Sequence, residues 1–84
     1  MVIERFKDGD ASRVGERFAQ RGRMLPEGVS YEGSWLDEAG TTCFQVMDAT
    51  DRAILDGWIA KWNDLVEFEV VPVLTSQEFW ARRR

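Results

Sequence analysis

Hydrophobic and polar residues alternate with different spacings between Met1 and Val73, and each change of spacing predicts a new element. A period of two residues is typical of a half-buried strand, whereas spacings of three and four residues are typical of an amphipathic helix. The period of two predicts strands at Met1–Phe6, Val29–Leu36, Thr41–Met47 and Leu65–Val73. The longer spacing predicts a helix at Ala11–Arg21 and a second that opens at Thr50–Asp51 and carries Ile54, Leu55, Trp58, Ile59 and Trp62.

This order of elements, βαββαβ, predicts an α+β fold of the ferredoxin-like type. With short connections and right-handed crossovers, the four strands form an antiparallel sheet of order 4-1-3-2 with both helices on one face. We expect one domain over residues 1–84, with its core in residues 1–73. Residues 74–84 are expected to hold a short helix at Thr75–Arg82 and an arginine tail.

Counting by twos along the strands divides the sheet into an apolar face and a mixed face. The apolar face, expected under the helices, holds Val66, Phe68, Val70, Phe44, Val46, Tyr31 and Trp35. The mixed face holds Glu67, Glu69, Arg5, Cys43, Gln45, Met47 and Ser34. We expect the mixed face to pack on a second copy in a homodimer, with Arg5 paired to Glu67 or Glu69. A bulge in one strand would invert its assignment.

Composition favours a folded, acidic domain. The chain is 44% hydrophobic and includes four tryptophans, which argues against disorder. Its formal charge is −4, and without Arg82, Arg83 and Arg84 it would be −7, so a nucleic-acid-binding body is not expected. For the arginine tail, a solvated terminus is favoured over an anionic partner.

Several functional classes lack their sequence features. No apolar run approaches the roughly 18 residues that a membrane-spanning helix needs, and the charged start does not resemble a signal peptide. There is no histidine, which removes the commonest general base and metal ligand. The chain has no phosphate-binding glycine loop, no Ser/His/Asp set and no spacing typical of a metal loop. We therefore expect a cytoplasmic protein without metal, cofactor, nucleic-acid or membrane partner.

Several stretches together resemble a small bacterial family carried as a domain of unknown function, over nearly the whole chain up to Val73. These stretches are residues 2–7 (VIERFK), 21–28 (RGRMLPEG), 34–35 (SW), 43–47 (CFQVM) and 58–62 (WIAKW). That family is similar to the dimeric α/β barrel superfamily, in which two ferredoxin-like sheets pair face to face. The superfamily includes cofactor-independent monooxygenases, lactone isomerases and stress-response proteins. The resemblance implies a dimer but no particular reaction.

The large aromatic side chains form the main candidate site. They are Tyr31, Trp35, Phe44, Trp58 and Trp62, which are expected to lie between the second helix and the sheet. Such rings can stack on a flat aromatic ligand, and a tyrosine hydroxyl or an indole N–H can orient it. The alternative, favoured for a short chain, is that these rings fill the core.

Three smaller candidates each have a structural alternative. Arg21 and Arg23 are possible anion contacts, although capping of the preceding helix and anchoring of the loop are the favoured explanation. Glu4 and Arg5 lie on a central strand, where pairing with carboxylates of the fourth strand is favoured over a perturbed acid at a pocket rim. The single cysteine, Cys43, excludes an internal disulfide framework and is expected to be a small buried core residue.

Together these observations predict a homodimeric small-ligand-binding or interaction module. The alternative is a cofactor-independent monooxygenase-like or isomerase-like enzyme that acts on a small aromatic or lactone-like substrate.

Overall fold

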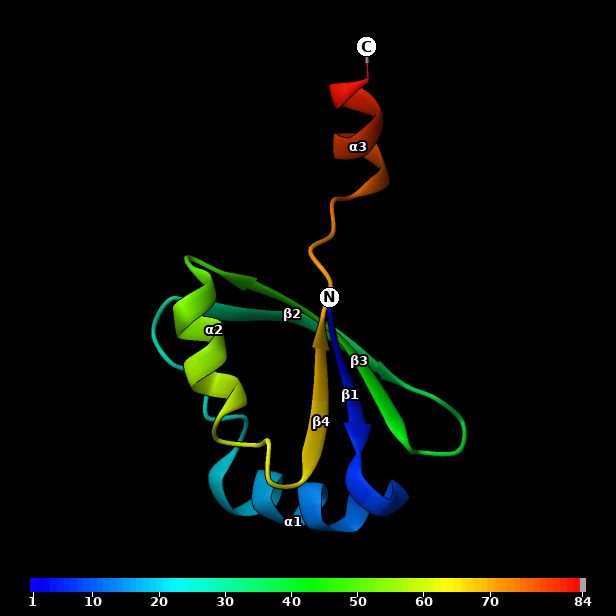
Figure 1. Cartoon of the computed structure of the whole chain (residues 1–84), viewed down its shortest axis with the longest axis vertical. Helices are drawn as coiled ribbons and strands as arrows, with labels where there is room; N and C mark the ends of the chain where they lie inside the picture. Colours follow the sequence, from blue (N-terminus) through cyan, green and yellow to red (C-terminus); the bar gives the residue numbers. More distant parts are fainter. Residues whose placement is uncertain (84) are drawn as a thin grey trace.

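A four-stranded antiparallel sheet organises the protein, and two helices lie against one of its faces (Figure 1). The computed structural model describes residues 1–83. The elements follow in the order β1 (Val2–Phe6), α1 (Ala11–Arg21), β2 (Val29–Leu36), β3 (Thr42–Ala49), α2 (Arg52–Ile59), β4 (Val66–Val70) and α3 (Ser76–Arg82), with a 3₁₀ turn at Lys7–Gly9 after β1. The predicted α+β class is therefore confirmed.

The sheet has the strand order β2-β3-β1-β4, which reads 4-1-3-2 when it is counted from the β4 edge. Strand β1 lies in the middle and pairs antiparallel with both β3 and β4. Its register places Glu4 opposite Cys43 on one side and opposite Phe68 on the other. The side chain at position 4 is therefore surrounded by neighbouring strands.

Local signals in the sequence set the ends of both packed helices. The Asp10 carboxylate accepts a hydrogen bond from the Ser12 backbone N–H at 3.0 Å, and Asp51 accepts one from that of Ile54 at 3.0 Å. Gly22 ends α1 with a positive φ, a conformation that other residues rarely adopt. Helix α2 stops at Ile59, earlier than predicted, because the chain tightens into turns such as Trp62 N–H to the Ile59 carbonyl.

The core forms where both helices meet the sheet. Trp58 of α2 is 1% exposed, and its ring meets Phe68 of β4 edge-on with 5.7 Å between the ring centres. Trp62 lies beyond the end of α2 and is still only 2% exposed. The strongest apolar stripe in the sequence, which includes both of these tryptophans, is thus buried against β1 and β4, as the helical spacing predicts.

The predicted face assignment is right for β4 and wrong for β3. Val66, Phe68 and Val70 pack on the helix side, as expected. In β3 the order is inverted: Cys43, Gln45 and Met47 face the helices, while Phe44 and Val46 lie on the open face. The prediction assigns the more apolar side of β3 to the core. It fails because the most buried residue of the strand is polar: Gln45 accepts a hydrogen bond from Arg23 inside the protein.

A β-bulge divides β2 between the two faces. The register shifts between Tyr31 and Gly33, so Tyr31 faces the helices whereas Trp35 lies opposite Phe44 on the open face. The predicted placement of Trp35 under the helices is therefore wrong, and so is that of Ser34 on the mixed face. Because side chains alternate with a period of two, one extra residue is enough to exchange the faces.

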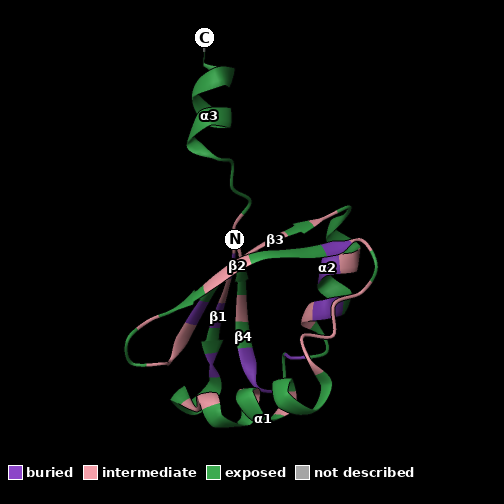
Figure 2. Ribbon diagram, turned by 180° about the vertical axis from the view of Figure 1, so that it is seen from behind, coloured by how far each residue is buried: buried purple, intermediate pink, exposed green. Residues whose placement is uncertain are grey.

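The chain leaves the sheet after β4 and forms a helix that stands apart from the rest (Figures 1 and 2). Strand β4 ends at Val70 rather than at the predicted Val73, shortly before Pro72, which has no N–H for a strand ladder. Helix α3 confirms the predicted terminal helix, and no residue of it is buried. The predicted arginine tail is described through Arg83; Arg84 lies outside the described residues.

Candidate functional site

The side chain of Glu4 is the most unusual group in the interior. Alternation along β1 places it on the helix face between Val2 and Phe6, where it is only 5% exposed. One of its carboxyl oxygens, Oε2, is buried and has no hydrogen-bond partner among residues 1–83. Buried polar atoms are nearly always paired, so an unpaired carboxyl oxygen at a cavity wall marks a place where a ligand or water can bind.

Burial also changes the acidity of this group. It raises the pKa of Glu4 to about 7, while the nearby positive charge of Arg23 and a hydrogen bond with Cys43 oppose the shift. The same burial and the neighbouring carboxyl group raise the pKa of the Cys43 thiol to about 11. Cys43 is therefore a buried thiol, as predicted, whereas Glu4 changes its protonation state near neutral pH.

Arg23 links the loop after α1 to the floor of this region. Its backbone carbonyl accepts hydrogen bonds from the indole N–H groups of Trp58 at 2.8 Å and Trp62 at 3.2 Å. Its side-chain Nε donates to Gln45 Oε1 at 3.2 Å. The guanidinium carbon lies 3.7 Å from the centre of the Tyr31 ring, a cation–π contact. These contacts hold the positive charge of Arg23 on the helix side of the sheet, near Glu4.

A cavity of about 260 Å³ opens between α1, α2 and the sheet at this point. Its volume is slightly below the usual range of ligand pockets, which begins at about 300 Å³, so only a small ligand fits. The walls are mainly apolar and the polar groups gather on the strands. The lining residues central to the site are Glu4, Arg23, Cys43 and Gln45, with Phe6, Val14, Phe18, Leu36, Trp58 and Trp62 as apolar walls.

The structure brings together only part of the predicted aromatic site. Trp58 and Trp62 line the cavity, and Tyr31 lies on the same face, where its hydroxyl is 2.7 Å from Ser34 Oγ. Trp35 and Phe44 lie on the opposite face of the sheet, so their assignment to this pocket is wrong. The Trp35 ring lies over Gly33, where a Cβ atom would come within 3.3 Å of it.

The sequence pattern gives too little weight to the polar residues of the pocket. The predicted pairing with a carboxylate of the fourth strand forms at Arg5, whose guanidinium lies 3.0 Å from Glu69 on the open face. Glu4 forms no salt bridge among residues 1–83 and lines the cavity, which fits the alternative interpretation of an acid at the rim of a pocket. The sequence does contain one sign of this buried acid: Glu4 lies on the same side of its strand as two apolar residues, Val2 and Phe6.

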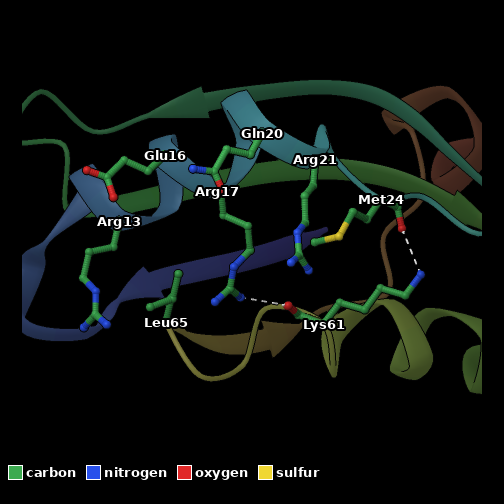
Figure 3. Close-up of a pocket in the computed structure, with 8 residues that line it drawn as sticks. All are labelled: Arg13, Glu16, Arg17, Gln20, Arg21, Met24, Lys61 and Leu65. Carbon is green, nitrogen blue, oxygen red and sulfur yellow. Dashed lines mark hydrogen bonds between the residues drawn. The ribbon is translucent and has the colours of Figure 1, made fainter.

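A second, larger hollow of about 610 Å³ lies beside α1 and carries several basic side chains (Figure 3). Arg13, Arg17 and Arg21 recur every four residues on α1, and Lys61 reaches the hollow from the segment after α2. Arg21 therefore lies here, whereas Arg23 lines the other cavity. The two predicted anion contacts do not form one site.

The central cation of this hollow already has an anionic partner. Arg17 holds the Asp64 carboxylate through two bonds of 2.7 Å and 2.6 Å, and this pairing lowers the pKa of Asp64 to about 2. Arg17 also donates to the Lys61 carbonyl at 3.0 Å, and Lys61 Nζ lies 3.4 Å from the Met24 carbonyl (Figure 3). These bonds tie α1 to the segment after α2, which is a structural role.

The described residues contain neither a cluster that could bind a metal ion nor a membrane-spanning helix. Over residues 1–83, no three His, Cys, Asp or Glu side chains are grouped so that they could hold a metal ion. No helix in that range combines the length and the apolar character needed to cross a membrane.

Comparison with known proteins gives one match. No curated protein and no solved structure matches the chain. The family described as Domain of unknown function (DUF3303) matches residues 1–82, which is nearly the whole chain. The protein therefore belongs to the DUF3303 family.

Proposed function

We propose that this protein is a small-ligand-binding module and that its ligand occupies the cavity between α1, α2 and the sheet. The observation that carries the proposal is the unpaired Oε2 of Glu4 at the wall of this cavity. A buried carboxyl oxygen without a partner costs about 1–3 kcal/mol. A ligand that offers Glu4 a hydrogen bond recovers part of that cost, and the apolar walls supply the remaining affinity.

The chemistry of the lining selects a small, largely apolar ligand with one or two polar groups. Phe18, 46% exposed, offers ring surface, while Arg23 and Glu4 offer a positive charge and an ionisable carboxyl group. Trp58 and Trp62 form the apolar back of the cavity. Arg23 is held in place by Gln45 and Tyr31, so little side-chain entropy is lost when a ligand binds. A small aromatic molecule with a hydroxyl or carbonyl group fits this description.

Titration of the ¹⁵N-labelled protein with phenol, benzoate and 2-naphthol tests the proposal. We expect at least one compound to shift the indole N–H signals of Trp58 and Trp62 in a saturable way. Glu4→Gln should change the affinity of that compound about tenfold, whereas the matched change Glu67→Gln on the open face should leave it unaltered. Indole signals that do not move at millimolar concentrations of any of the three compounds would contradict the proposal.

An enzyme is the second candidate, and the acidity of Glu4 favours it. A general base works best when its pKa lies near the working pH, and the pKa of Glu4 reaches about 7 without any histidine. The simplest reaction is isomerase-like: the Glu4 carboxylate takes a proton from a carbon next to a carbonyl group and returns it to another carbon. A monooxygenase-like reaction requires O₂ as a second substrate.

Exchange of a carbon-bound proton separates the enzyme from the binding module. If Glu4 is a base, a bound carbonyl compound should exchange that proton with D₂O in the presence of the protein. Glu4→Gln should abolish the exchange while the compound still binds. Binding without any exchange leaves the ligand-binding function alone.

We further propose that two copies associate through the open sheet face as a dimeric α/β barrel of ferredoxin-like protomers. The open face supports this because it carries Trp35, 61% exposed, beside Phe44, 36% exposed. Large exposed rings on an uncovered sheet are typical of a contact surface. A sedimentation mass equal to one chain at micromolar concentration would exclude this arrangement.

A further inference from the structure

The segment after β4 forms an arm, described through Arg83, whose hydrogen bonds to the rest of the protein lie at its base. Val71 is the last residue tied to the sheet: its N–H donates to the Met1 carbonyl at 2.8 Å, and the amino terminus donates to the Val71 carbonyl at 2.7 Å. Beyond it, the hydrogen bonds of residues 75–83 all lie within the arm. Figures 1 and 2 show α3 projecting along the longest dimension of the molecule, which is 46 Å.

The arm is apolar where it meets water. Its large side chains are Val73, Leu74, Phe79 and Trp80, which are 51%, 41%, 40% and 63% exposed. Phe79 and Trp80 meet edge-on with 5.2 Å between ring centres, and Arg83 lies over the Phe79 ring at 4.8 Å. These contacts gather the two rings and a positive charge into one compact group at the tip.

The sequence of the arm contains a strong signal for the start of a helix. Thr75 and Glu78 form a reciprocal capping box, in which the Glu78 N–H donates to Thr75 Oγ1 at 3.1 Å and the Thr75 N–H donates to Glu78 Oε1 at 3.2 Å. A seven-residue helix is nevertheless marginal in water without tertiary packing. The arm therefore has the features of a segment that packs on another surface.

We propose that this arm docks on the open sheet face of a second copy of the chain. The open face presents the exposed rings of Trp35 and Phe44, which match the apolar tip of the arm. It also carries the Glu67 carboxylate, opposite in charge to Arg82 and Arg83, whereas Glu69 on the same strand is already paired with Arg5 at 3.0 Å. The acceptor and the arm thus complement each other in both apolar surface and charge.

The direction of the arm favours a partner over the arm's own sheet. Helix α3 points away from the sheet of its own chain, so its tip does not cover Trp35 or Phe44 there (Figure 2). Every copy has one arm and one open face. Reciprocal exchange between two copies satisfies both surfaces in a closed, two-fold dimer. This inference rests on the proposed homodimer. The arm and the partner's sheet cannot both cover Trp35 and Phe44, so the arm, and not the partner's sheet, covers these two rings.

Sedimentation equilibrium of the full chain and three variants tests the arm. We expect the double variant Phe79→Ser/Trp80→Ser to weaken dimerisation by about tenfold or more, because it removes the apolar tip. Trp35→Ser should weaken it as well, because it removes part of the acceptor. The matched control Gln77→Ser, on the same helix, should dimerise as tightly as the natural chain.

Each other outcome has a separate meaning. A monomeric natural chain overturns both the homodimer and the arm exchange, while the ligand-binding proposal stands or falls on its own titration. A natural dimer that Phe79→Ser/Trp80→Ser leaves equally tight overturns the arm exchange alone. Binding of the monomer to phosphatidylglycerol vesicles that depends on Phe79 and Trp80 also overturns it, since the arm would then serve a membrane surface. Far-UV circular dichroism confirms that each variant folds.

Discussion

The two faces of the sheet carry charged side chains from the same strands, buried on one face and exposed to water on the other. On the helix face, Glu4 is almost completely buried, and one of its oxygens has no partner. On the open face, Arg5 and Glu69 are about half exposed and form a pair at 3.0 Å. Adjacent residues of one strand thus carry charge under different conditions: burial raises the pKa of Glu4, whereas water screens the pair of Arg5.

This difference shows where a small domain can place chemistry. The open face tolerates charges at little cost because water solvates them, so its charges carry little information about function. The helix face admits a carboxyl group only at a cost in stability, and that cost is difficult to explain unless the group is used. The comparison therefore directs attention to Glu4 and its cavity rather than to the more numerous charges outside.

The largest test compares a tryptophan from each face. Trp58→Ala should lower the free energy of unfolding by about 3–5 kcal/mol, because it opens a cavity and removes one of the two hydrogen bonds to the Arg23 carbonyl. Trp35→Ala should lower it by about 0.5 kcal/mol at most, because most of that ring is already in water. Urea denaturation of both variants at low protein concentration measures the two values. Equal losses would show that the faces do not differ as described.

The next test uses pH. Below pH 4.5, Glu4 is protonated in both folded and unfolded chains; between pH 4.5 and about 7, only the unfolded chain releases the proton. Stability therefore falls as pH rises through this window, by up to about 3 kcal/mol from Glu4 alone. Glu4→Gln should match the natural chain near pH 4 and be more stable than it at pH 8.

The exposed acid Glu67 provides the control for this pH test. Glu67→Gln replaces the same functional group on the open face, so it should leave the pH profile of stability nearly unchanged. If the difference between the natural chain and Glu4→Gln does not depend on pH, Glu4 titrates normally and the buried-acid description is wrong.

The smallest expected effect is that of the open-face ion pair. A double-mutant cycle of Arg5→Ala and Glu69→Ala should give a coupling energy of about 0.5 kcal/mol. Added salt should reduce this coupling, because both side chains are half exposed. A coupling of several kcal/mol would mean that this face is covered in solution, which would itself support association of two copies.

Much of the fold follows from periodicity and local signals. The stripe around Leu55 and Trp58 specifies a buried helix, and Asp10 and Asp51 cap the two packed helices where side-chain oxygens can reach free N–H groups. The pattern also predicts an ion pair between Arg5 and a carboxylate of the fourth strand, and Arg5 pairs with Glu69. These features depend on residues close in sequence or on neighbouring strands, so a one-dimensional pattern contains them.

The composition of the site depends on information that the pattern lacks. A bulge after Tyr31 sends Trp35 to the other face, and no residue type in β2 specifies it uniquely. Gln45 is buried because Arg23, distant in the chain, supplies its hydrogen bond. A buried polar side chain finds its hydrogen-bond partner on another segment. The pattern of a single strand therefore does not show which polar residues are buried.

The amino-acid sequence alone determined the class of fold, the extent of most elements and the position of the terminal helix, because these follow from spacing, caps and turns. Only the tertiary structure decided which side of the sheet each β3 residue faces, that one carboxyl oxygen of Glu4 lacks a partner and lies beside a cavity, and that α3 projects from the body. Those properties arise from register and from packing between distant segments, where a shift of one residue exchanges the inside of the sheet for its outside.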